Sequence, residues 1–374
     1  ALAPPLAPGA ARRGAGSDAG GGGAMSARFR TGLVVGKFCP LHRGHEYVLN
    51  HARARCEEVV VISYTRPELA GCEPERREAW LAACCPWARR LVVTPERLRA
   101  WWGATGGPVE LPQNSEPDDV HRRFVGRLCL EVLRCEVDAV FTSEAYGEGF
   151  AAELTRLFPS RRSGHAPPVV HVAVDPARVA VPVSGEALRR DPHGLRHFLS
   201  PAVYASFVRR VALLGGESTG KSTLALALAE RLGTVAVPEY GRERWQARGG
   251  RLVYEDLLEI AREHVAREEA AALRAVRFLI CDTTPLTTLF YSRHLFGRAE
   301  PELERLAQRA YDPVVLCAAD FPFVQDGTRS EETLRDLQQS WYRAELVRRG
   351  VAHTEVRGGV EERIDTLHKA GVLS

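Results

Sequence analysis

The chain reads Val211-Ala212-Leu213-Leu214-Gly215-Gly216-Glu217-Ser218-Thr219-Gly220-Lys221-Ser222-Thr223 over one stretch, and helix-forming residues 224–230 follow directly. In such a strand-to-helix loop, the glycines let successive backbone N–H groups point at a phosphate, and the helix adds its positive N-terminal end. The order of strand, Gly-x-x-x-x-Gly-Lys-Ser and helix predicts a phosphate-binding loop. We expect Lys221 to reach the β- and γ-phosphates of ATP and Ser222 to bind Mg²⁺. The other expected ATP-binding loop residues are Gly215, Gly216, Glu217, Ser218, Thr219, Gly220 and Thr223.

This loop lies about two hundred residues into a chain of 374, which leaves room for another folded unit in front of it. Residues 1–29 are mostly Ala, Gly, Pro and Arg with little to bury, so we expect a disordered tail. We place a first domain at residues 30–190, a short connector at 191–207 and a second domain at 208–374.

Composition narrows the class of protein. With 45% apolar and 26% charged residues, the chain is typical of soluble globular proteins. A net charge of +3 with interspersed signs does not indicate nucleic-acid binding, and no apolar run approaches the roughly eighteen residues that span a membrane. Nine cysteines without a C-x-x-C pair indicate reduced thiols in a cytoplasm. We expect small-molecule partners, and the sequence leaves open whether the chain forms a homo-oligomer.

Strand-forming and helix-forming stretches alternate from Thr31 onward, which predicts a parallel sheet covered on both faces, with ligands at the carboxyl ends of the strands. The expected strands of the first domain are 33–38, 58–63, 91–94, 139–142 and 169–174, and the expected helices are 46–55, 74–85 and 118–135.

His42 and His45 lie where the first strand turns into the first helix and should face the same way. We expect both to donate hydrogen bonds to triphosphate oxygens, with Gly44 allowing close backbone approach and Lys37 adding charge. Such charge stabilisation suits the departure of pyrophosphate in a nucleotidyl transfer. A histidine metal pair and a packing role are the alternatives for these rings.

The run Gly36-x-Phe38-x-Pro40-x-His42-x-Gly44-His45 resembles the signature of the nucleotidyltransferase superfamily. Its second signature is Ile-Ser-x-Thr-x-x-Arg, and residues 183–189 resemble it, with Glu186 in place of Thr. The resemblance implies a catalytic role for Lys37, His42 and His45. It implies ATP binding by Gly36, Phe38, Gly44, Ser184 and Arg189.

The two signatures in one chain resemble the NadR-type bifunctional nicotinamide-nucleotide adenylyltransferases and ribosylnicotinamide kinases. Residues 143–147, 239–243, 281–288 and 326–329 add to the resemblance, which extends over about residues 30–374. It implies an α/β fold, a Rossmann-like nucleotidyltransferase domain followed by a P-loop kinase domain, each with a parallel sheet. We expect no repressor function, because the Gly/Ala/Pro-rich tail cannot form the helix-turn-helix that some members carry in front.

Acidic groups follow two expected strands of the second domain, 235–237 and 278–282. Asp282 ends the second of them and could hold Mg²⁺ or take the proton of the attacking hydroxyl. The family tends to have a second Asp where this chain has Thr284, so Glu239 is the other candidate acid. The remaining expected strands are 314–317 and 351–356, and the expected helices are 254–276 and 361–369.

Four further side chains complete the expected site. By resemblance, Arg329 belongs to a lid that binds the transferring phosphoryl group, and Tyr240 and Arg242 bind substrate. Trp102, in a glycine-rich stretch, could stack on a pyridinium ring. The alternatives are a solvated helix face for the arginine and simple core packing for the tryptophan.

Together with the motifs, the resemblance implies phosphorylation of nicotinamide riboside to nicotinamide mononucleotide (NMN) in the second domain, and adenylyl transfer from ATP to NMN, giving NAD, in the first. Three alternatives stay open. They are a kinase whose first domain is a degenerate nucleotide sensor, a non-enzymatic regulator that responds to nucleotides, and a different pairing of transferase and kinase.

Overall fold

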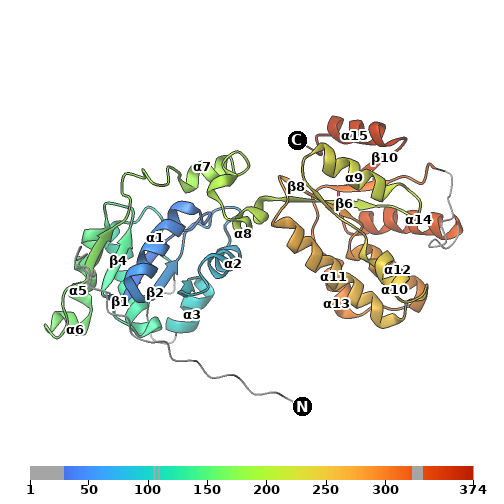
Figure 1. Cartoon of the computed structure of the whole chain (residues 1–374). Coiled ribbons are helices and arrows are strands. Elements are labelled where there is room, and N and C mark those ends of the chain that lie inside the picture. The colour runs from blue at the N-terminus through green and yellow to red at the C-terminus, as the bar shows by residue number, and fades with distance from the viewer. Residues whose placement is uncertain (1–28, 104–106, 108–109, 322–331, 374) are drawn as a thin grey trace, which may run out of the picture.

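The computed structural model describes residues 29–103, 107, 110–321 and 332–373. Within them, two five-stranded sheets follow one another along the chain, and the paired strands of both sheets are parallel (Figure 1). The expected α/β class with two parallel sheets is confirmed. The expected tail lies almost wholly outside the described residues.

The first sheet has the strand order β3-β2-β1-β4-β5. Its central strand is buried on both faces because successive side chains enter different cores. Leu33 packs with Phe124 on one side of the sheet, and Val34 packs with Val48 on the other. The strands are β1 (Phe29–Gly36), β2 (Cys56–Ser63), β3 (Arg89–Val92), β4 (Ala139–Thr142) and β5 (Val170–Ala173).

Helices cover both faces of this sheet. One expected helix, 74–85, ends a residue early as α2, and two others differ more from the expected bounds. The first helix begins at Arg43, three residues early, because His42 caps it. The helix expected at 118–135 is α-helical only to Arg127, continues as a π-helix at Leu128–Leu133 and ends at the left-handed Arg134. The helices are α1 (Arg43–Arg55), α2 (Pro74–Cys84), α3 (Pro95–Trp102), α4 (Asp118–Arg127), α5 (Gly147–Leu157), α6 (Pro159–Arg162) and α7 (Gly185–Arg190).

The second sheet has the order β10-β9-β6-β8-β7. Its strands are β6 (Arg209–Leu214), β7 (Val235–Val237), β8 (Phe278–Asp282), β9 (Val314–Cys317) and β10 (Thr354–Val356). Its helices are α9 (Lys221–Arg231), α10 (Tyr240–Ala247), α11 (Tyr254–Ala272), α12 (Pro285–Phe296), α13 (Pro301–Leu306), α14 (Glu332–Arg348) and α15 (Val360–Lys369). Apolar side chains of α9 and α15 pack on one face, and those of α11 to α14 pack on the other. The last strand is shorter than the expected 351–356, and α11 ends four residues before 276.

The connector contains a short helix, α8 (Pro201–Tyr204), between two 3₁₀ turns. It touches both units: Trp80 Nε1 donates to Ser206 Oγ at 2.7 Å, and the backbone N–H of Arg277 donates to the Tyr204 hydroxyl at 3.0 Å. These bonds tie the connector to α2 and to the residue before β8.

Both sequence motifs follow the central strand of a sheet, β1 in the first and β6 in the second. From each central strand the chain fills one side of the sheet and then the other. This arrangement leaves a crevice at the carboxyl ends of the strands, where ligands of such sheets bind. Among the described helices, none combines the length and apolar character needed to cross a membrane.

Candidate functional site

The first site is built on the N-terminal cap of α1. The Gly44 N–H donates to Nδ1 of His42 at 3.2 Å, and the His42 N–H donates to Nδ1 of His45 at 3.4 Å. The two imidazole rings stack with their centroids 3.7 Å apart. The expectation that both rings face the same way at a helix start is therefore confirmed.

These two bonds also decide which ring nitrogen carries the proton. A backbone N–H can only donate, so Nδ1 of each ring must accept. Each neutral imidazole then carries its proton on Nε2. The helix start thus holds two stacked rings whose remaining polar group is an N–H donor.

Both rings are held neutral by their surroundings. Burial, with the nearby charge of Arg178, lowers the pKa of His42 from 6.5 to about 4. Burial, followed by the charges of His42 and Arg178, lowers the pKa of His45 well below its ordinary value. Near neutral pH, the pair therefore serves as hydrogen-bond donors without adding net charge.

A cavity of about 480 Å³ opens over this cap. It collects the expected residues Gly36, Lys37, Phe38, His42, Gly44, His45 and Arg189. Phe38 has φ +50° and is buried with its ring against His45. The close fit of this aromatic ring fixes the direction in which His45 points.

The second signature reaches the same cavity through α7. Arg189 donates to the Cys39 carbonyl oxygen and lines the cavity. Ser184 instead caps α7 by accepting from the Ala187 N–H at 3.2 Å, and it is not among the lining residues. Glu186 also lines the cavity, but its carboxylate pairs with Arg190 on the solvent side of the helix at 3.0 Å.

Arg178 is a cavity residue that sequence reasoning missed. It lies in the loop between β5 and α7, pairs with Glu144 at 2.8 Å and is close enough to lower the pKa of both histidines. The motifs contain no signal for it, because only the folding of the loop over the cap brings it there.

Trp102 does not fit the expected stacking role. It is the last residue of α3 and not part of a loop, and its side chain is 3% exposed in the core beside Leu98 and Phe124. Arg127 lies over its ring at 5.1 Å. Core packing covers almost all of the apolar surface of this large ring, and the ring does not line the cavity.

The second site is the loop between β6 and α9. Gly220 has φ +74°, and a Cβ on Gly216 would lie 2.6 Å from the Arg335 carbonyl oxygen, so both positions require glycine. The amides of Gly216 and Glu217 are held by the Gln339 and Gln338 side chains at 2.9 and 3.0 Å. The loop is thus fastened to α14.

Lys221 lies along the inside of this loop. Its Nζ donates to the carbonyl oxygens of Gly215 and Gly216 at 2.9 and 2.7 Å. Thr219 Oγ1 closes the loop from within by donating to Gly216 O at 2.8 Å. The ammonium is therefore held at the loop, where phosphates would be bound.

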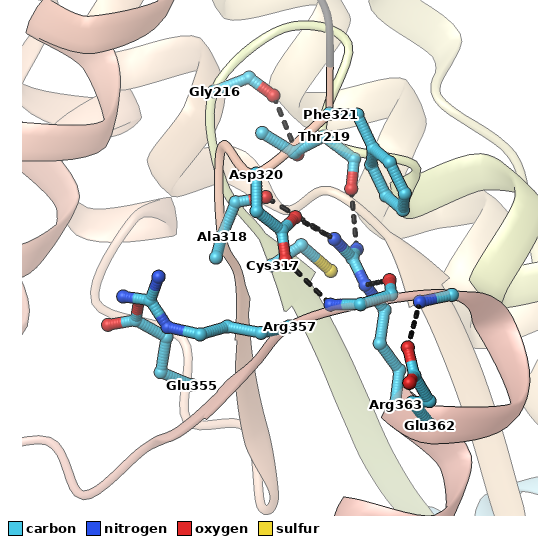
Figure 2. Close-up of polar contacts among 12 residues, drawn as sticks. Gly216, Thr219, Cys317, Ala318, Asp320, Phe321, Glu355, Arg357, Glu362 and Arg363 are labelled. Carbon is cyan, nitrogen blue, oxygen red and sulfur yellow. Dashed lines mark hydrogen bonds and ion pairs between the residues drawn. The ribbon is translucent and has the colours of Figure 1, made fainter.

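A buried arginine supports the same loop from behind. Figure 2 shows Arg363 of α15 donating to the Thr219 carbonyl at 2.6 Å and to Asp320 at 2.7 Å. The side chain is 1% exposed, and the ring of Phe321 covers its guanidinium group at 4.7 Å. Asp320 also accepts from the Gly358 N–H at 2.6 Å. One guanidinium thus joins the phosphate-binding loop to the loops after β9 and β10.

The two acidic candidates differ in environment. Burial raises the pKa of Glu239, which also feels Lys221 and Asp282, and its carboxylate lies 3.9 Å from Arg242. Asp282 is 4% exposed, and its Oδ1 has no hydrogen-bond partner among the described residues. An unpartnered buried carboxylate oxygen and the exposed Ser222 hydroxyl are ligands that Mg²⁺ accepts, so these residues fit the expected metal.

A cavity of about 390 Å³ extends from the loop between α10, α11 and α12. The expected residues that line it are Glu217, Ser218, Thr219, Gly220, Lys221, Ser222, Thr223, Glu239 and Arg242. The lining residues that sequence reasoning missed include Trp245, Leu252, Leu257, Ile260, His264 and Tyr291. The spacing of 257, 260 and 264 along one helix face was the available signal.

Tyr240 and Arg329 stand apart from the other expected residues. Tyr240 is not among the residues that line the cavity, and Arg267 covers its ring at 4.3 Å, so the expected substrate contact is not supported. It begins α10, where its side chain is directed at α11. Arg329 lies outside the described residues.

Comparison with known proteins agrees with this architecture. The AAA domain family model matches residues 210–363. A protein of Escherichia coli, the trifunctional NAD biosynthesis/regulator protein NadR, is 30% identical over 315 residues, which are 80% of this chain and 71% of that protein. Its counterpart from Salmonella typhimurium is 28% identical over 308 residues with the same coverage. A nicotinamide-nucleotide adenylyltransferase of Aeropyrum pernix is 38% identical over 71 residues, 17% of this chain and 41% of that protein.

Two solved structures share the fold over most of the chain. A NadR protein in complex with NAD and AMP-PNP superimposes with a TM-score of 0.65 and 18% identity, covering 92% of this chain and 98% of the other. A NadR protein in complex with NR gives the same score and identity and covers 92% and 96%. The succession of two parallel-sheet units is therefore shared with these proteins.

Proposed function

This chain belongs to the NadR family, and on that premise we propose that it is a bifunctional enzyme of NAD biosynthesis. The second unit transfers the γ-phosphoryl group of ATP to the 5′-hydroxyl of nicotinamide riboside and forms NMN. The first unit joins NMN to the α-phosphorus of a second ATP, which releases pyrophosphate and forms NAD. The product of one site is the substrate of the other.

One observation carries this proposal. A single chain holds two helix starts that are suited to anion binding, the His42 cap of α1 and the loop before α9. Each follows the central strand of its own sheet and opens into a cavity. Two such sites suit two successive reactions at phosphorus that both use ATP.

In the kinase reaction, the loop amides and Lys221 hold the phosphates in line with the acceptor. Glu239, whose pKa burial raises, is the group on the cavity wall that takes the proton of the attacking hydroxyl. The apolar wall of Trp245, Leu257 and Ile260 receives the pyridinium ring and keeps water out. Mg²⁺ would be held by Ser222 and Asp282 and would neutralise charge on the ATP phosphates.

In the adenylyl transfer, charge builds on the departing pyrophosphate. The Nε2–H groups of His42 and His45 donate to it, and the charges of Lys37, Arg178 and Arg189 stabilise it. Both histidines can donate while neutral, so their low pKa values do not oppose this role. Glu186 adds little repulsion, because its carboxylate is directed at Arg190.

The decisive experiment supplies the purified protein with nicotinamide riboside, ATP and Mg²⁺ and separates the products by chromatography. We expect NAD and pyrophosphate, with NMN as the intermediate. If NMN alone accumulates, and supplied NMN is not adenylylated either, the first unit is a nucleotide sensor. If neither product forms while nucleotide still binds, the proposal is wrong, and the protein is a regulator or a different pairing of transferase and kinase.

The proposal also includes the domain bounds, the place where the protein acts and its oligomeric state. The working units are residues 30–190 and 208–374 with the connector 191–207 between them. The protein acts in the cytoplasm on small molecules and not on nucleic acid, in keeping with nine free cysteines and a net charge of +3. Light scattering of the purified protein would determine whether it forms a homo-oligomer.

A further inference from the structure

Helix α11 carries two buried ionisable side chains that the reactions above do not use. His264 is 3% exposed and Glu268, one turn later, is 0% exposed. His264 Nε2 lies 3.3 Å from Glu268 Oε1. The imidazole lines the kinase cavity together with Glu239, so this pair reaches the reaction site from behind.

Glu268 is held from its other side by the segment that precedes β9. The Tyr311 hydroxyl donates to Glu268 Oε1 at 2.7 Å, and Arg309 Nε donates to Oε2 at 2.9 Å. Burial alone would raise the pKa of Glu268, but the nearby His264, the hydrogen bond of the Tyr311 hydroxyl and the charge of Arg309 outweigh it, and the pKa is lowered. The carboxylate is therefore ionised although no part of it reaches solvent.

A buried ionised carboxylate lowers stability, and attachment of α11 to the segment before β9 does not by itself require one. Taking a carboxylate out of water costs several kcal/mol, and apolar side chains of similar size often serve as well or better. The same contacts do have a use at the cavity. A fixed negative charge behind an imidazole sets the orientation and the charge of the ring, and therefore what the ring presents to its neighbours.

We propose that Arg309, Tyr311 and Glu268 form a buried relay that orients His264, and that His264 is a positioning residue for Glu239 and the acceptor hydroxyl in the kinase cavity. The inference rests on the proposed kinase function of this unit. It assigns His264 no bond to the transferred group, and it requires the ring to be held in one orientation beside Glu239. In agreement, His264 lies near enough to Glu239 to oppose the effect of burial on the pKa of that carboxylate.

The chain offers a matched control in the next residue. Glu269 pairs with Arg210 at 3.1 Å and with the same Arg309, but its side chain is half exposed. Glu268→Gln keeps the shape of the buried side chain and removes its charge. Glu269→Gln makes the same chemical change at the surface.

We expect Glu268→Gln to lower kcat for phosphorylation of nicotinamide riboside about tenfold or more, part of the ~10²–10⁴-fold that a positioned acid or base supplies. KM for ATP should stay within about twofold, because the phosphate-binding loop is untouched. Adenylylation of supplied NMN should be unchanged in the same sample, which shows that equal amounts of active protein are compared. The unchanged KM for ATP, with urea unfolding of the second unit, reports that the kinase unit is folded. Glu269→Gln should match the wild type in all three measurements.

Tyr311→Phe provides a second reading should Glu268→Gln not fold, since it removes one hydroxyl and keeps the ring. We expect kcat to fall several-fold, again with KM for ATP nearly unchanged. An unchanged kcat in Glu268→Gln, or in Tyr311→Phe where that variant alone folds, overturns the relay even if the variant is less stable. A wild-type protein that does not phosphorylate nicotinamide riboside overturns the proposed function itself, which is a different result.

Discussion

At the scale of single residues, the first site depends on two histidines that stay neutral. Each ring accepts a backbone N–H at Nδ1, so the fold itself determines that Nε2 is the donor. A donor that carries no charge can approach a triphosphate and then lose contact with pyrophosphate more easily than a fixed cation can. Because the fold lowers the pKa of both histidines, the stability of the first unit depends on pH.

We predict that the free energy of unfolding of the first unit falls as pH is lowered from about 6.5 to 4. In this window an unfolded chain takes up a proton at His42, whose ordinary pKa is 6.5, whereas the folded chain does so only near pH 4. The unfolded state then binds more protons, so acid favours it, by about 3 kcal/mol for this one residue over the whole window. Urea unfolding between pH 7 and 4.5, followed by hydrogen exchange of β1 and β2, measures the effect.

His42→Asn is the matched variant, because asparagine also caps helices but does not titrate. Its stability should depend less on pH over the same range, with the remaining slope due to His45 and to other groups whose pKa the fold lowers, such as His121. Identical pH profiles for the variant and the wild type would show that His42 is not held neutral by the fold.

Residue types in motifs could be predicted from sequence, but their neighbours could not. His42, His45 and Lys221 lie where spacing places them, because short-range backbone geometry decides it. Arg178 and His264 reach the cavities from a loop and from a helix face, and only tertiary packing brings them there. The chemistry of the ring predicts a ligand contact for Trp102, and the resemblance implies one for Tyr240. In the structure Phe124 packs edge-on against the first ring, and Arg267 covers the second.

At the scale of elements, the phosphate-binding loop is supported by a helix at the far end of the chain. Arg363 of α15 donates to the carbonyls of Thr219, Gly358 and Ala318 and to the Asp320 carboxylate, and together these contacts join three loops (Figure 2). The geometry of the loop therefore depends on contacts well outside its own sequence.

We predict that Arg363→Gln raises KM for ATP in the kinase reaction several-fold and destabilises the second unit by about 3 kcal/mol, since one partner of a buried ion pair is lost. Initial rates and urea unfolding measure the two effects. Arg357→Gln is the control, because Arg357 pairs with Glu355 on the surface at 2.7 Å and should change neither quantity appreciably. Equal behaviour of the two variants would mean that Arg363 does not hold the loop.

Element bounds followed from sequence where burial alone sets them. The strands at 139–142, 278–282 and 314–317 match their expected bounds, because each is a short, largely apolar run that is buried along its whole length. The strand at 235–237 matches as well, although it is only partly buried. The bounds of β10 did not follow, since only Thr354–Val356 pair with β9 and the residues before them do not join the sheet. The start of α1 was missed because histidine is an unusual capping residue.

At the scale of the whole molecule, the two sites occupy separate sheets. No residue lines both cavities within the described part of the chain, and the connector contacts each unit through surfaces away from its cavity. The NMN made in the second unit therefore has to leave one cavity and enter the other. Nothing in this arrangement requires both steps to occur on the same chain.

We therefore predict that two single-site variants restore each other's missing step. Lys221→Ala removes the ammonium that reaches the phosphates and should abolish phosphorylation of nicotinamide riboside, while leaving adenylylation of supplied NMN intact. His45→Ala removes one Nε2–H donor and should lower adenylylation at least about 100-fold, while leaving the kinase intact. Neither variant alone should convert nicotinamide riboside to NAD, and an equimolar mixture should do so.

Two additions make this experiment decisive. The chain has three lysines, and Lys369 is the one at the end of α15. Lys369→Ala should behave as the wild type and so controls for the loss of a positive charge. Isotope-labelled NMN added to the wild type should be diluted into the NAD formed from unlabelled riboside, because the intermediate passes through solution. If the mixture makes no NAD while each variant retains its own activity, NMN must pass directly between the units of one chain, and the two cavities are then coupled in a way that their separate linings do not indicate.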